Sequence, residues 1–212
     1  MDKQEILSKI DHTLLKSFAK WEDIEKLCDE AVKFHTASVC IPPCYVKRVH
    51  DKYGDSLVIC TVIGFPLGYE TSEAKLTEAV KAIDDGATEI DTVINITDVK
   101  NGDFDAVRDE LTLLRDVTKG KILKVIIETC YLTEEEKKTL CSIVTETGAD
   151  FIKTSTGFGT AGADVKDVEL FKANIGPAVQ IKAAGGIRTV EDAEKMINAG
   201  ASRIGSSAIA AE

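Results

Sequence analysis

The sequence predicts an α/β protein with parallel strands, and three observations support this fold class. Short apolar runs, often β-branched, alternate with longer segments of helical periodicity along the 212-residue chain, which is typical of strand–helix–strand units. Eight such runs follow one another at a spacing of about 25 residues, and eight units close naturally into a barrel. No GxGxxG pattern follows the first run, which argues against the competing doubly wound sheet. We therefore expect a (β/α)8 TIM barrel, formed as a single domain by residues 1–212.

Each candidate strand is a short apolar run between polar or glycine-containing segments. The expected strands are residues 10–13, 38–41, 57–63, 89–94, 123–129, 151–155, 179–183 and 203–205. No linker or change of composition divides them, which is why we expect one domain.

The intervening segments place apolar residues at positions i, i+3, i+4 and i+7, which line one face of a helix. The residues expected to face the sheet are Ile24, Leu27, Cys28 and Ala31; Leu76, Ala79, Val80 and Ile83; Val107, Leu111 and Leu114; Leu140 and Val144; and Val190, Ala193 and Ile197.

Helix start and stop signals agree with this assignment. Thr133 stands three residues before Glu136 and Thr189 three before Asp192, a spacing typical of helix N-caps. Glycines that follow a helical segment and precede a strand are expected to be left-handed C-caps. These are Gly86, Gly148 and Gly200.

Composition excludes several classes of protein. The apolar fraction of 44% and the low content of Gly (15) and Pro (4) fit neither a disordered chain nor a fibrous repeat. A net charge of −10 argues against a nucleic-acid partner. The longest apolar stretch, residues 58–67, is interrupted and too short to span a bilayer, and the start MDKQEIL has no apolar signal core. We expect a cytoplasmic protein with no membrane partner.

The six cysteines do not form a recognisable disulfide or zinc pattern. They are Cys28, Cys40, Cys44, Cys60, Cys130 and Cys141. Cys40 and Cys44 lack a second Cys/His pair at zinc-finger spacing, and the three histidines form no HExxH-type cluster. We therefore expect reduced thiols and no metal.

Two lysines stand inside strands, where a surface role does not explain them. Lys153 lies in DFIKTSTGF and Lys182 in VQIKAAGGI. If Ile152 and Ile181 face the helices, period-2 alternation turns both lysines into the barrel. Function in such barrels lies at the carboxyl ends of the strands. The alternative is that each ammonium group reaches out to solvent.

The close placement of the two lysines predicts an altered pKa and a reactive amine. Burial and mutual repulsion disfavour the charged forms, so we expect at least one lysine pKa to fall. A neutral amine is the nucleophile that forms a Schiff base. Asp91, in TEIDTVINI, would face these amines and could relay protons, or form a structural ion pair. Asp11, in KIDHTLLK, is a weaker acidic candidate that could instead cap a turn.

Glycine-rich loops follow the last three strands of the expected barrel. AAGGIR contains Gly185, Gly186 and Arg188, IGSSAI follows the last strand, and STGFGTAG provides hydroxyl groups. Barrels often bind phosphate at the last two of these loops, through backbone N–H groups. Cys40, at the end of SVCIPP, would also point toward the mouth, although a free cysteine is more often a small core residue.

Seven motifs along the chain resemble those of a known family. IDHTLLK, TVIGFPLG, EIDTVIN, LKVIIETCYLT, FIKTSTGFGT, IKAAGGIRT and RIGSS are similar, in order, to motifs of the deoxyribose-phosphate aldolases. The resemblance extends from about residue 10 to residue 207. It implies a (β/α)8 barrel and a class I, cofactor-free aldolase that cleaves 2-deoxy-D-ribose 5-phosphate to acetaldehyde and D-glyceraldehyde 3-phosphate. It also implies a phosphorylated-sugar partner and a homo-oligomer, a dimer or a tetramer.

The resemblance assigns roles to individual residues. Lys153 corresponds to the Schiff-base lysine, Lys182 to the neighbour that lowers its pKa, and Asp91 to the proton relay. Cys40 corresponds to a position near the hydroxyl end of the substrate. The remaining residues match substrate-binding or phosphate-binding loops: Thr156, Gly157, Gly185, Gly186, Arg188, Gly205, Ser206 and Ser207.

Some positions depart from the family pattern. Pro42 replaces a common asparagine, Thr92 a common methionine and Ala184 a common serine. The sequence ends five residues after Ser207, so we expect a short closing helix without the C-terminal tyrosine that assists proton transfer in some members. Two alternatives stay open at this point: another Schiff-base aldolase or transaldolase, and a sugar-phosphate-binding barrel without catalytic activity.

Overall fold

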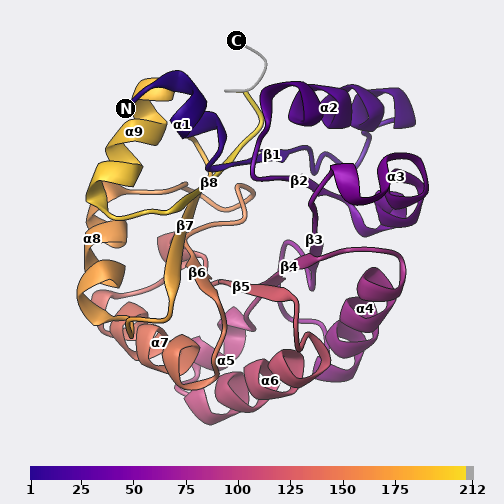
Figure 1. Cartoon of the computed structure of the whole chain (residues 1–212). Helices are drawn as coiled ribbons and strands as arrows, with labels where there is room; N and C mark the ends of the chain where they lie inside the picture. The colour runs from indigo at the N-terminus through magenta and orange to yellow at the C-terminus, as the bar shows by residue number, and fades with distance from the viewer. Residues whose placement is uncertain (209–212) are drawn as a thin grey trace.

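Eight parallel strands form a closed barrel in chain order, with β8 pairing to β1. The computed structural model describes residues 1–208, and Figure 1 shows the helices arranged as a ring around the strands. The strands are β1 (Ile10–Thr13), β2 (Ser38–Ile41), β3 (Ile59–Ile63), β4 (Glu89–Val93), β5 (Ile122–Ile126), β6 (Phe151–Lys153), β7 (Gln180–Ala184) and β8 (Arg203–Ser206). The predicted fold class is confirmed. The expected closing helix falls on residues 209–212, outside the described part of the chain.

Helices follow the strands, with two short additional ones. The α-helices are α1 (Lys3–Leu7), α2 (Trp21–Phe34), α3 (Val46–Tyr53), α4 (Ser72–Asp84), α5 (Ile96–Lys100), α6 (Phe104–Val117), α7 (Glu134–Glu146), α8 (Val165–Asn174) and α9 (Val190–Ala199). Among the described residues, no helix is both long enough and apolar enough to cross a membrane.

The local signals for helix ends are confirmed. Thr133 and Glu136 form a capping box at the start of α7, and the Thr189 hydroxyl accepts a hydrogen bond from the Asp192 N–H at the start of α9. The three glycines predicted as C-caps all have positive φ values, which glycine adopts without steric cost. They are Gly86 (110°), Gly148 (70°) and Gly200 (134°).

Several strands are shorter than the apolar runs that predicted them. β6 ends at Lys153, although the run continues to residue 155, and β5 ends at Ile126. The chain beyond remains buried and hydrogen-bonded: the Ile127 N–H donates to the Lys153 carbonyl at 3.1 Å. An apolar run therefore predicts which residues are buried. The strand itself ends where its regular hydrogen bonding to the neighbouring strand ends.

The predicted inner face of α4 is correct except for Val80. Ala79 is buried and Leu76 and Ile83 pack against the core, whereas Val80 is 44% exposed. The buried residues of the helix also include Lys75 and Ala82. Lys75 donates hydrogen bonds to the Glu110 carboxylate at 2.7 Å and to the Val93 carbonyl at 2.9 Å. The buried lysine is stable here because its ammonium group is paired with a carboxylate. A prediction based on the spacing of apolar residues does not identify a buried lysine.

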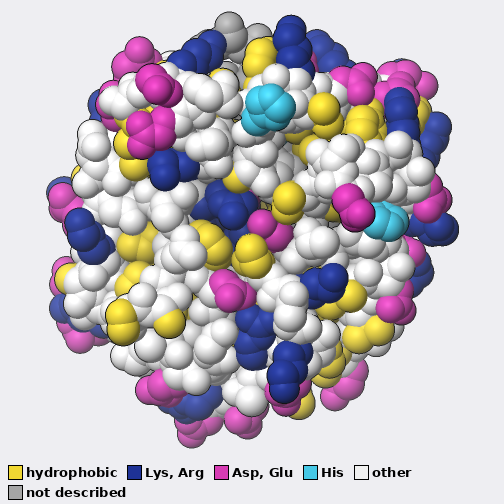
Figure 2. Space-filling view, in the orientation of Figure 1, with side chains coloured by type: hydrophobic (Ala, Val, Ile, Leu, Met, Phe, Trp, Pro, Cys, Tyr) yellow, Lys and Arg dark blue, Asp and Glu magenta, His cyan; other side chains and the backbone are white. Residues whose placement is uncertain are grey.

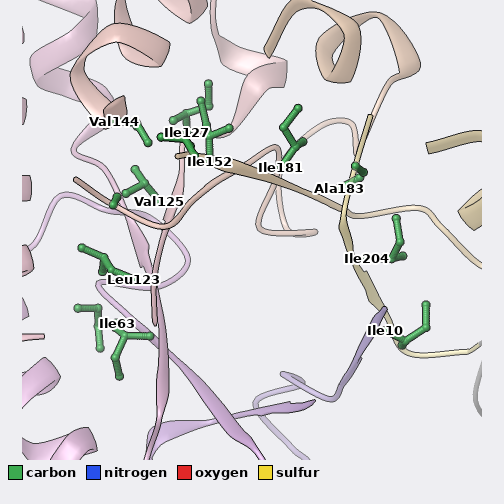
Figure 3. Packing of buried hydrophobic residues seen from close by; sticks show 14 of the residues in the cluster. Ile10, Ile63, Leu123, Val125, Ile127, Val144, Ile152, Ile181, Ala183 and Ile204 are labelled. Carbon is green, nitrogen blue, oxygen red and sulfur yellow. The ribbon is translucent and has the colours of Figure 1, made fainter. Parts of the chain in front are cut away.

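Alternate strand residues divide the interior into two regions. One set points outward and packs under the helices; Figure 3 shows Ile152, Ile181, Ala183 and Ile204 in this shell. The other set points into the barrel, where Cys40 and Cys60 belong to a separate small cluster. This alternation turns the Asp, Glu, Lys and Arg side chains of the strands into the barrel.

We expect Lys75→Met to destabilise the protein by about 3–5 kcal/mol, because Glu110 would remain buried without its partner. Urea unfolding followed by circular dichroism measures the change. The double variant Lys75→Met/Glu110→Leu should recover most of the loss. Equal stability of the wild type and Lys75→Met would contradict this interpretation of α4.

Candidate active site

One carboxylate at the centre of the barrel contacts three ammonium groups. Asp91 on β4 accepts hydrogen bonds from Lys153 (2.7 Å) and Lys182 (2.6 Å) on Oδ2, and from Lys124 (2.8 Å) on Oδ1. All four side chains are buried. Figure 2 shows basic and acidic side chains close together at the centre of this face of the molecule.

The inward orientation of the two predicted lysines is confirmed. Lys153 and Lys182 are direct neighbours in the β6–β7 ladder. Ile152 and Ile181, one position earlier on each strand, are buried in the outer hydrophobic shell. Both lysines therefore lie on the same side of the sheet and meet at Asp91.

Besides Asp91 and the two predicted lysines, the cluster contains four charged residues, of which only Asp11 was a candidate from the sequence. Lys182 contacts Asp11 at 2.5 Å, and Lys124 contacts Glu89 at 2.6 Å. Arg203 contacts Asp11 at 2.7 Å and Glu89 at 3.2 Å. Lys124 stands in the apolar run LKVII, so the signal that identified Lys153 was also present there. Asp11 belongs to the site and does not serve as a turn cap.

The carboxylates determine the protonation of this cluster. Burial alone would raise the pKa of Asp91, but Lys124, Lys153 and Lys182 outweigh it and hold that pKa well below its usual range. Burial alone would lower the pKa of Lys182, but Asp11 and Asp91 outweigh it and raise that pKa. Lys182 is therefore not a lysine whose pKa falls. Crowding with carboxylates stabilises the ammonium form.

Lys153 differs from the other two lysines. It contacts one carboxylate among the described residues, whereas Lys182 contacts two and Lys124 lies within 4 Å of three. It is also slightly exposed, at 3%, when the other two are fully buried. Of the three ammonium groups that contact Asp91, that of Lys153 therefore has the fewest ion-pair partners and the greatest exposure.

Two groups of donor atoms are close enough to share a cation. They are Cys40, Cys60 and Asp91, and Asp11, Cys60 and Glu89; within each group the donor atoms lie within 4.8 Å of one another. Lysine ammonium groups already occupy these carboxylates. A metal ion would have to displace them, so this donor set fits amine chemistry better than metal coordination.

The predicted phosphate loops lie together at one edge of the mouth. Gly157, Gly185 and Gly186 have φ values of 87°, 86° and 79°, a conformation that suits glycine. The Ala163 N–H donates to the Gly185 carbonyl at 3.0 Å, and a Cβ on Gly162 would lie 2.2 Å from that oxygen. The loops after β6 and β7 therefore hold each other in place by close backbone contact.

The polar residues at these loops fall into two groups. Arg188 and Ser207 are exposed and able to meet an anion. The Ser206 hydroxyl is buried and donates to the Ile187 carbonyl at 2.9 Å. Gly205 allows close packing, since a Cβ there would lie 2.9 Å from the Ala184 Cβ. The Ser206 hydroxyl thus connects β8 to the loop after β7.

Glu128, which sequence reasoning missed, anchors the loop after β6. Its backbone is left-handed (φ 51°) and its side chain is 2% exposed. Its carboxylate accepts hydrogen bonds from the Thr156 hydroxyl and from the Thr156 N–H. The Thr156 hydroxyl in turn accepts from the Phe158 N–H at 3.0 Å. A non-glycine residue in this conformation costs about 1–3 kcal/mol, which these contacts offset; the predicted substrate contact Thr156 is therefore held by Glu128.

A mostly apolar pocket lies beside this anchor. Its volume is about 600 Å³, and Glu128 and Thr156 contribute polar atoms to its wall. Phe158, also in the wall, packs edge-on against Phe65 with ring centroids 5.4 Å apart. Phe65 contacts the inner cluster of Cys40 and Cys60, so this aromatic pair stands between the pocket and the barrel interior.

Comparison with known proteins gives matches over nearly the whole chain. The model of the DeoC/LacD family aldolases matches residues 5–209. A deoxyribose-phosphate aldolase from Clostridium botulinum (strain Alaska E43 / Type E3) is 59% identical over 207 residues, 98% of this chain and 94% of that protein. One from Clostridioides difficile (strain 630) is 55% identical, covering 96% of this chain and 93% of that protein.

Solved structures share the fold. A tetrameric deoxyribose phosphate aldolase from Aeropyrum pernix superposes with a TM-score of 0.91 at 33% identity, over 98% of this chain and 89% of that one. The aldolase QR15 superposes with a TM-score of 0.93 at 40% identity, over 97% of this chain and 92% of that one.

The lowered pKa of Asp11 predicts a pH-dependent contribution to stability. Burial opposes the shift, but Lys182, Lys124 and Arg203 outweigh it. The stabilisation is fully present above the unfolded pKa of about 3.9 and is lost as the pH falls toward the native value. We expect Asp11→Asn to destabilise by about 3 kcal/mol at neutral pH, with the difference from wild type shrinking below about pH 4.

Urea unfolding across this pH range measures the effect. Asp51→Asn, at an exposed i,i+4 pair with Lys47, is the matched control and should change stability by less than about 1 kcal/mol at every pH. A difference for Asp11→Asn that stays constant down to about pH 3 would contradict the cluster electrostatics.

Glu128→Ala should loosen the loop that carries Thr156. We expect amide hydrogen exchange in residues 154–162 to accelerate about tenfold, because the acceptor for Thr156 is lost. Glu134→Ala, an exposed carboxylate at the start of α7, is the control and should leave that loop unchanged. Unaltered exchange in Glu128→Ala would show that the loop is held elsewhere.

Proposed function

The chain belongs to the DeoC/LacD family of aldolases, and we propose that it cleaves 2-deoxy-D-ribose 5-phosphate to acetaldehyde and D-glyceraldehyde 3-phosphate through a Schiff base on Lys153. The observation that carries the proposal is the shared contact of three ammonium groups with Asp91, in which Lys153 is the least ion-paired and the most accessible. A Schiff base requires an amine that is neutral and within reach of the substrate carbonyl.

The charge of the cluster supports Lys153 as that amine. Among the described residues, the cluster of Asp91 and its ion-paired neighbours holds four cations (Lys124, Lys153, Lys182, Arg203) and three carboxylates (Asp11, Glu89, Asp91). A buried surplus of positive charge disfavours one of the protons. Loss of one proton makes the cluster neutral, and the carboxylates beside Lys182 and Lys124 raise the pKa values of those two lysines.

The first chemical steps follow from this arrangement. The neutral Lys153 Nζ attacks the C1 aldehyde, water leaves, and a protonated iminium forms. The iminium withdraws electrons from the C2–C3 bond, which breaks as the C3 hydroxyl loses its proton. The released aldehyde is D-glyceraldehyde 3-phosphate, and an enamine remains on Lys153. Asp91 and Lys182, which share a contact at 2.6 Å, are the acid–base pair we assign to this proton.

The enamine is then protonated at C2, and water hydrolyses the resulting iminium to acetaldehyde and free Lys153. Asp91 contacts both Lys153 and Lys182 through the same oxygen, Oδ2. This shared oxygen provides a short path by which a proton passes between the two amines. Lys182 thus acts in proton transfer and as a neighbouring cation, with its own ammonium form stabilised by Asp11.

The phosphate group is placed at the glycine loops. We assign its contacts to the backbone of Gly157, Gly185, Gly186, Gly205 and Ser207, and to the exposed side chain of Arg188. Of these residues, Gly157, Gly185 and Gly186 have positive φ values. Backbone N–H groups in such turns can point together at an anion. The Ser206 and Thr156 side chains are assigned to holding these loops, and Cys40 to the wall of the site near Asp91.

The setting of the enzyme is part of the proposal. We propose a cytoplasmic protein of deoxyribose phosphate catabolism that assembles as a dimer or a tetramer and has no membrane or nucleic-acid partner. The tetrameric Aeropyrum pernix structure supports assembly, and the net charge of −10 opposes nucleic-acid binding.

Reduction with borohydride in the presence of acetaldehyde should attach an ethyl group to Lys153, because hydride traps the iminium. Peptide mass spectrometry locates the label. Lys153→Met should lose both the label and cleavage of 2-deoxy-D-ribose 5-phosphate while keeping its circular dichroism spectrum. Lys75→Arg, which keeps a buried cation in α4, is the control and should still be labelled at Lys153. A label on another lysine, or turnover by Lys153→Met, would refute the assignment.

A further inference from the structure

Two cysteines lie side by side on the inner wall of the barrel. Cys40 on β2 and Cys60 on β3 are direct partners in the parallel ladder, and both are fully buried. Their sulfur atoms and an Asp91 oxygen all lie within 4.8 Å of one another. Neighbouring strands are about 4.8 Å apart, within the Cα separation of about 4.4–6.8 Å that a disulfide spans. The backbone can therefore accommodate a bond between them.

The two thiols have different environments. Cys60 donates a hydrogen bond to Asp91 Oδ1 at 3.1 Å, and Lys124 donates to its sulfur at 3.2 Å. The neighbouring Cys60 lowers the pKa of Cys40 despite burial, with help from Lys182 and Lys153. Burial raises the pKa of Cys60 well above its usual value, with further contributions from Cys40 and Asp91. Cys40 is thus the thiol that loses its proton more readily, and Cys60 the thiol that retains its proton.

Lys153 and these two sulfurs lie around the same carboxylate, Asp91. Asp91 contacts Lys153 at 2.7 Å and belongs to the same group of atoms as both cysteines. A site that admits a sugar phosphate to Lys153 admits a peroxide, which is smaller. In this step the inference rests on the proposed function.

We propose that Cys40 and Cys60 form a reversible redox switch, in which a peroxide converts the two thiols to a disulfide and closes the site to catalysis. The Cys40 thiolate attacks one oxygen of hydrogen peroxide and becomes a sulfenic acid, while the other oxygen leaves as hydroxide and takes up a proton. The Cys60 sulfur then displaces the sulfenic hydroxyl, which leaves as water with the Cys60 proton. Two thiols lose two electrons and two protons, and one peroxide becomes two waters.

Disulfide formation alters the centre of the proposed site. Cys60 loses the proton that it donates to Asp91 Oδ1, and its sulfur is drawn toward Cys40 and away from Lys124. Asp91 then loses one of its hydrogen-bond donors, and the wall beside Lys153 changes shape. A thiol such as dithiothreitol reverses the change, because it reduces the disulfide.

The other cysteines provide controls. Cys44 is exposed and Cys130 is half-buried, whereas Cys28 and Cys141 are buried in α2 and α7, outside the barrel. The test uses a Cys44→Ser background, so that peroxide does not react at the exposed thiol. Cys60→Ala removes the proposed partner, Cys60→Ser tests it with a smaller change of shape, and Cys141→Ala is the matched control for loss of a buried cysteine.

Each protein is treated with hydrogen peroxide, alkylated, digested and analysed by mass spectrometry, and its activity is measured relative to its own reduced form. We expect a Cys40–Cys60 linked peptide, a loss of activity of at least tenfold, and recovery of both with dithiothreitol. Cys141→Ala should behave in the same way. Cys60→Ala and Cys60→Ser should give sulfinic acid at Cys40 and a loss that dithiothreitol does not restore.

Three outcomes would overturn the proposal: no linked peptide from folded protein, a linked peptide with unchanged activity, or full recovery of Cys60→Ala by dithiothreitol. The mass of the linked peptide is measured without an activity assay. Failure of the reduced protein to cleave the sugar phosphate would instead count against the proposed function, so the two failures are distinguishable.

Discussion

The Asp91 carboxylate, held between three ammonium groups inside a closed barrel, determines most of what this site can do. A single buried carboxylate cannot neutralise three cations, so Asp11 and Glu89 enter the interior from β1 and β4, and Arg203 joins them from β8. Each ion sheds its hydration shell, which costs several kcal/mol per charge unless the pairing is good. The cluster meets this requirement through contacts from six strands, which explains why the barrel must be closed for the site to exist.

The same network gives three lysine side chains different electrostatic environments. Lys124 and Lys182 are surrounded by carboxylates, and their pKa values are raised for that reason, although burial alone would lower them. Lys153 has a single carboxylate partner and a small opening to solvent. The number of acidic partners therefore distinguishes Lys153 from Lys124 and Lys182. The distribution of the carboxylates, and not only the neighbouring positive charge, makes the three environments different.

The loops around the mouth are held by contacts that differ in kind from those of the interior. Glu128, in a left-handed conformation, fixes the loop after β6 through Thr156, and Gly162 lets that loop lie against Gly185. These contacts use backbone groups and one buried carboxylate, so the glycine loops are held without long flexible side chains. Rigid placement of this kind preserves the geometry of a binding site.

The sequence by itself determined the fold class, the number of strands and the inward direction of Lys153, Lys182 and Asp91. These features depend on local periodicity: alternation by two in strands and by 3.6 in helices is written into the order of residues. It did not determine that Lys75 of α4 is buried, since Lys75 is stabilised by Glu110 from another helix. It also did not determine that Lys124, Glu89 and Arg203 meet inside the barrel, that the pKa of Lys182 is raised, or that Cys40 and Cys60 are adjacent. Those properties depend on distances between residues far apart in the chain, and only closure of the barrel sets such distances.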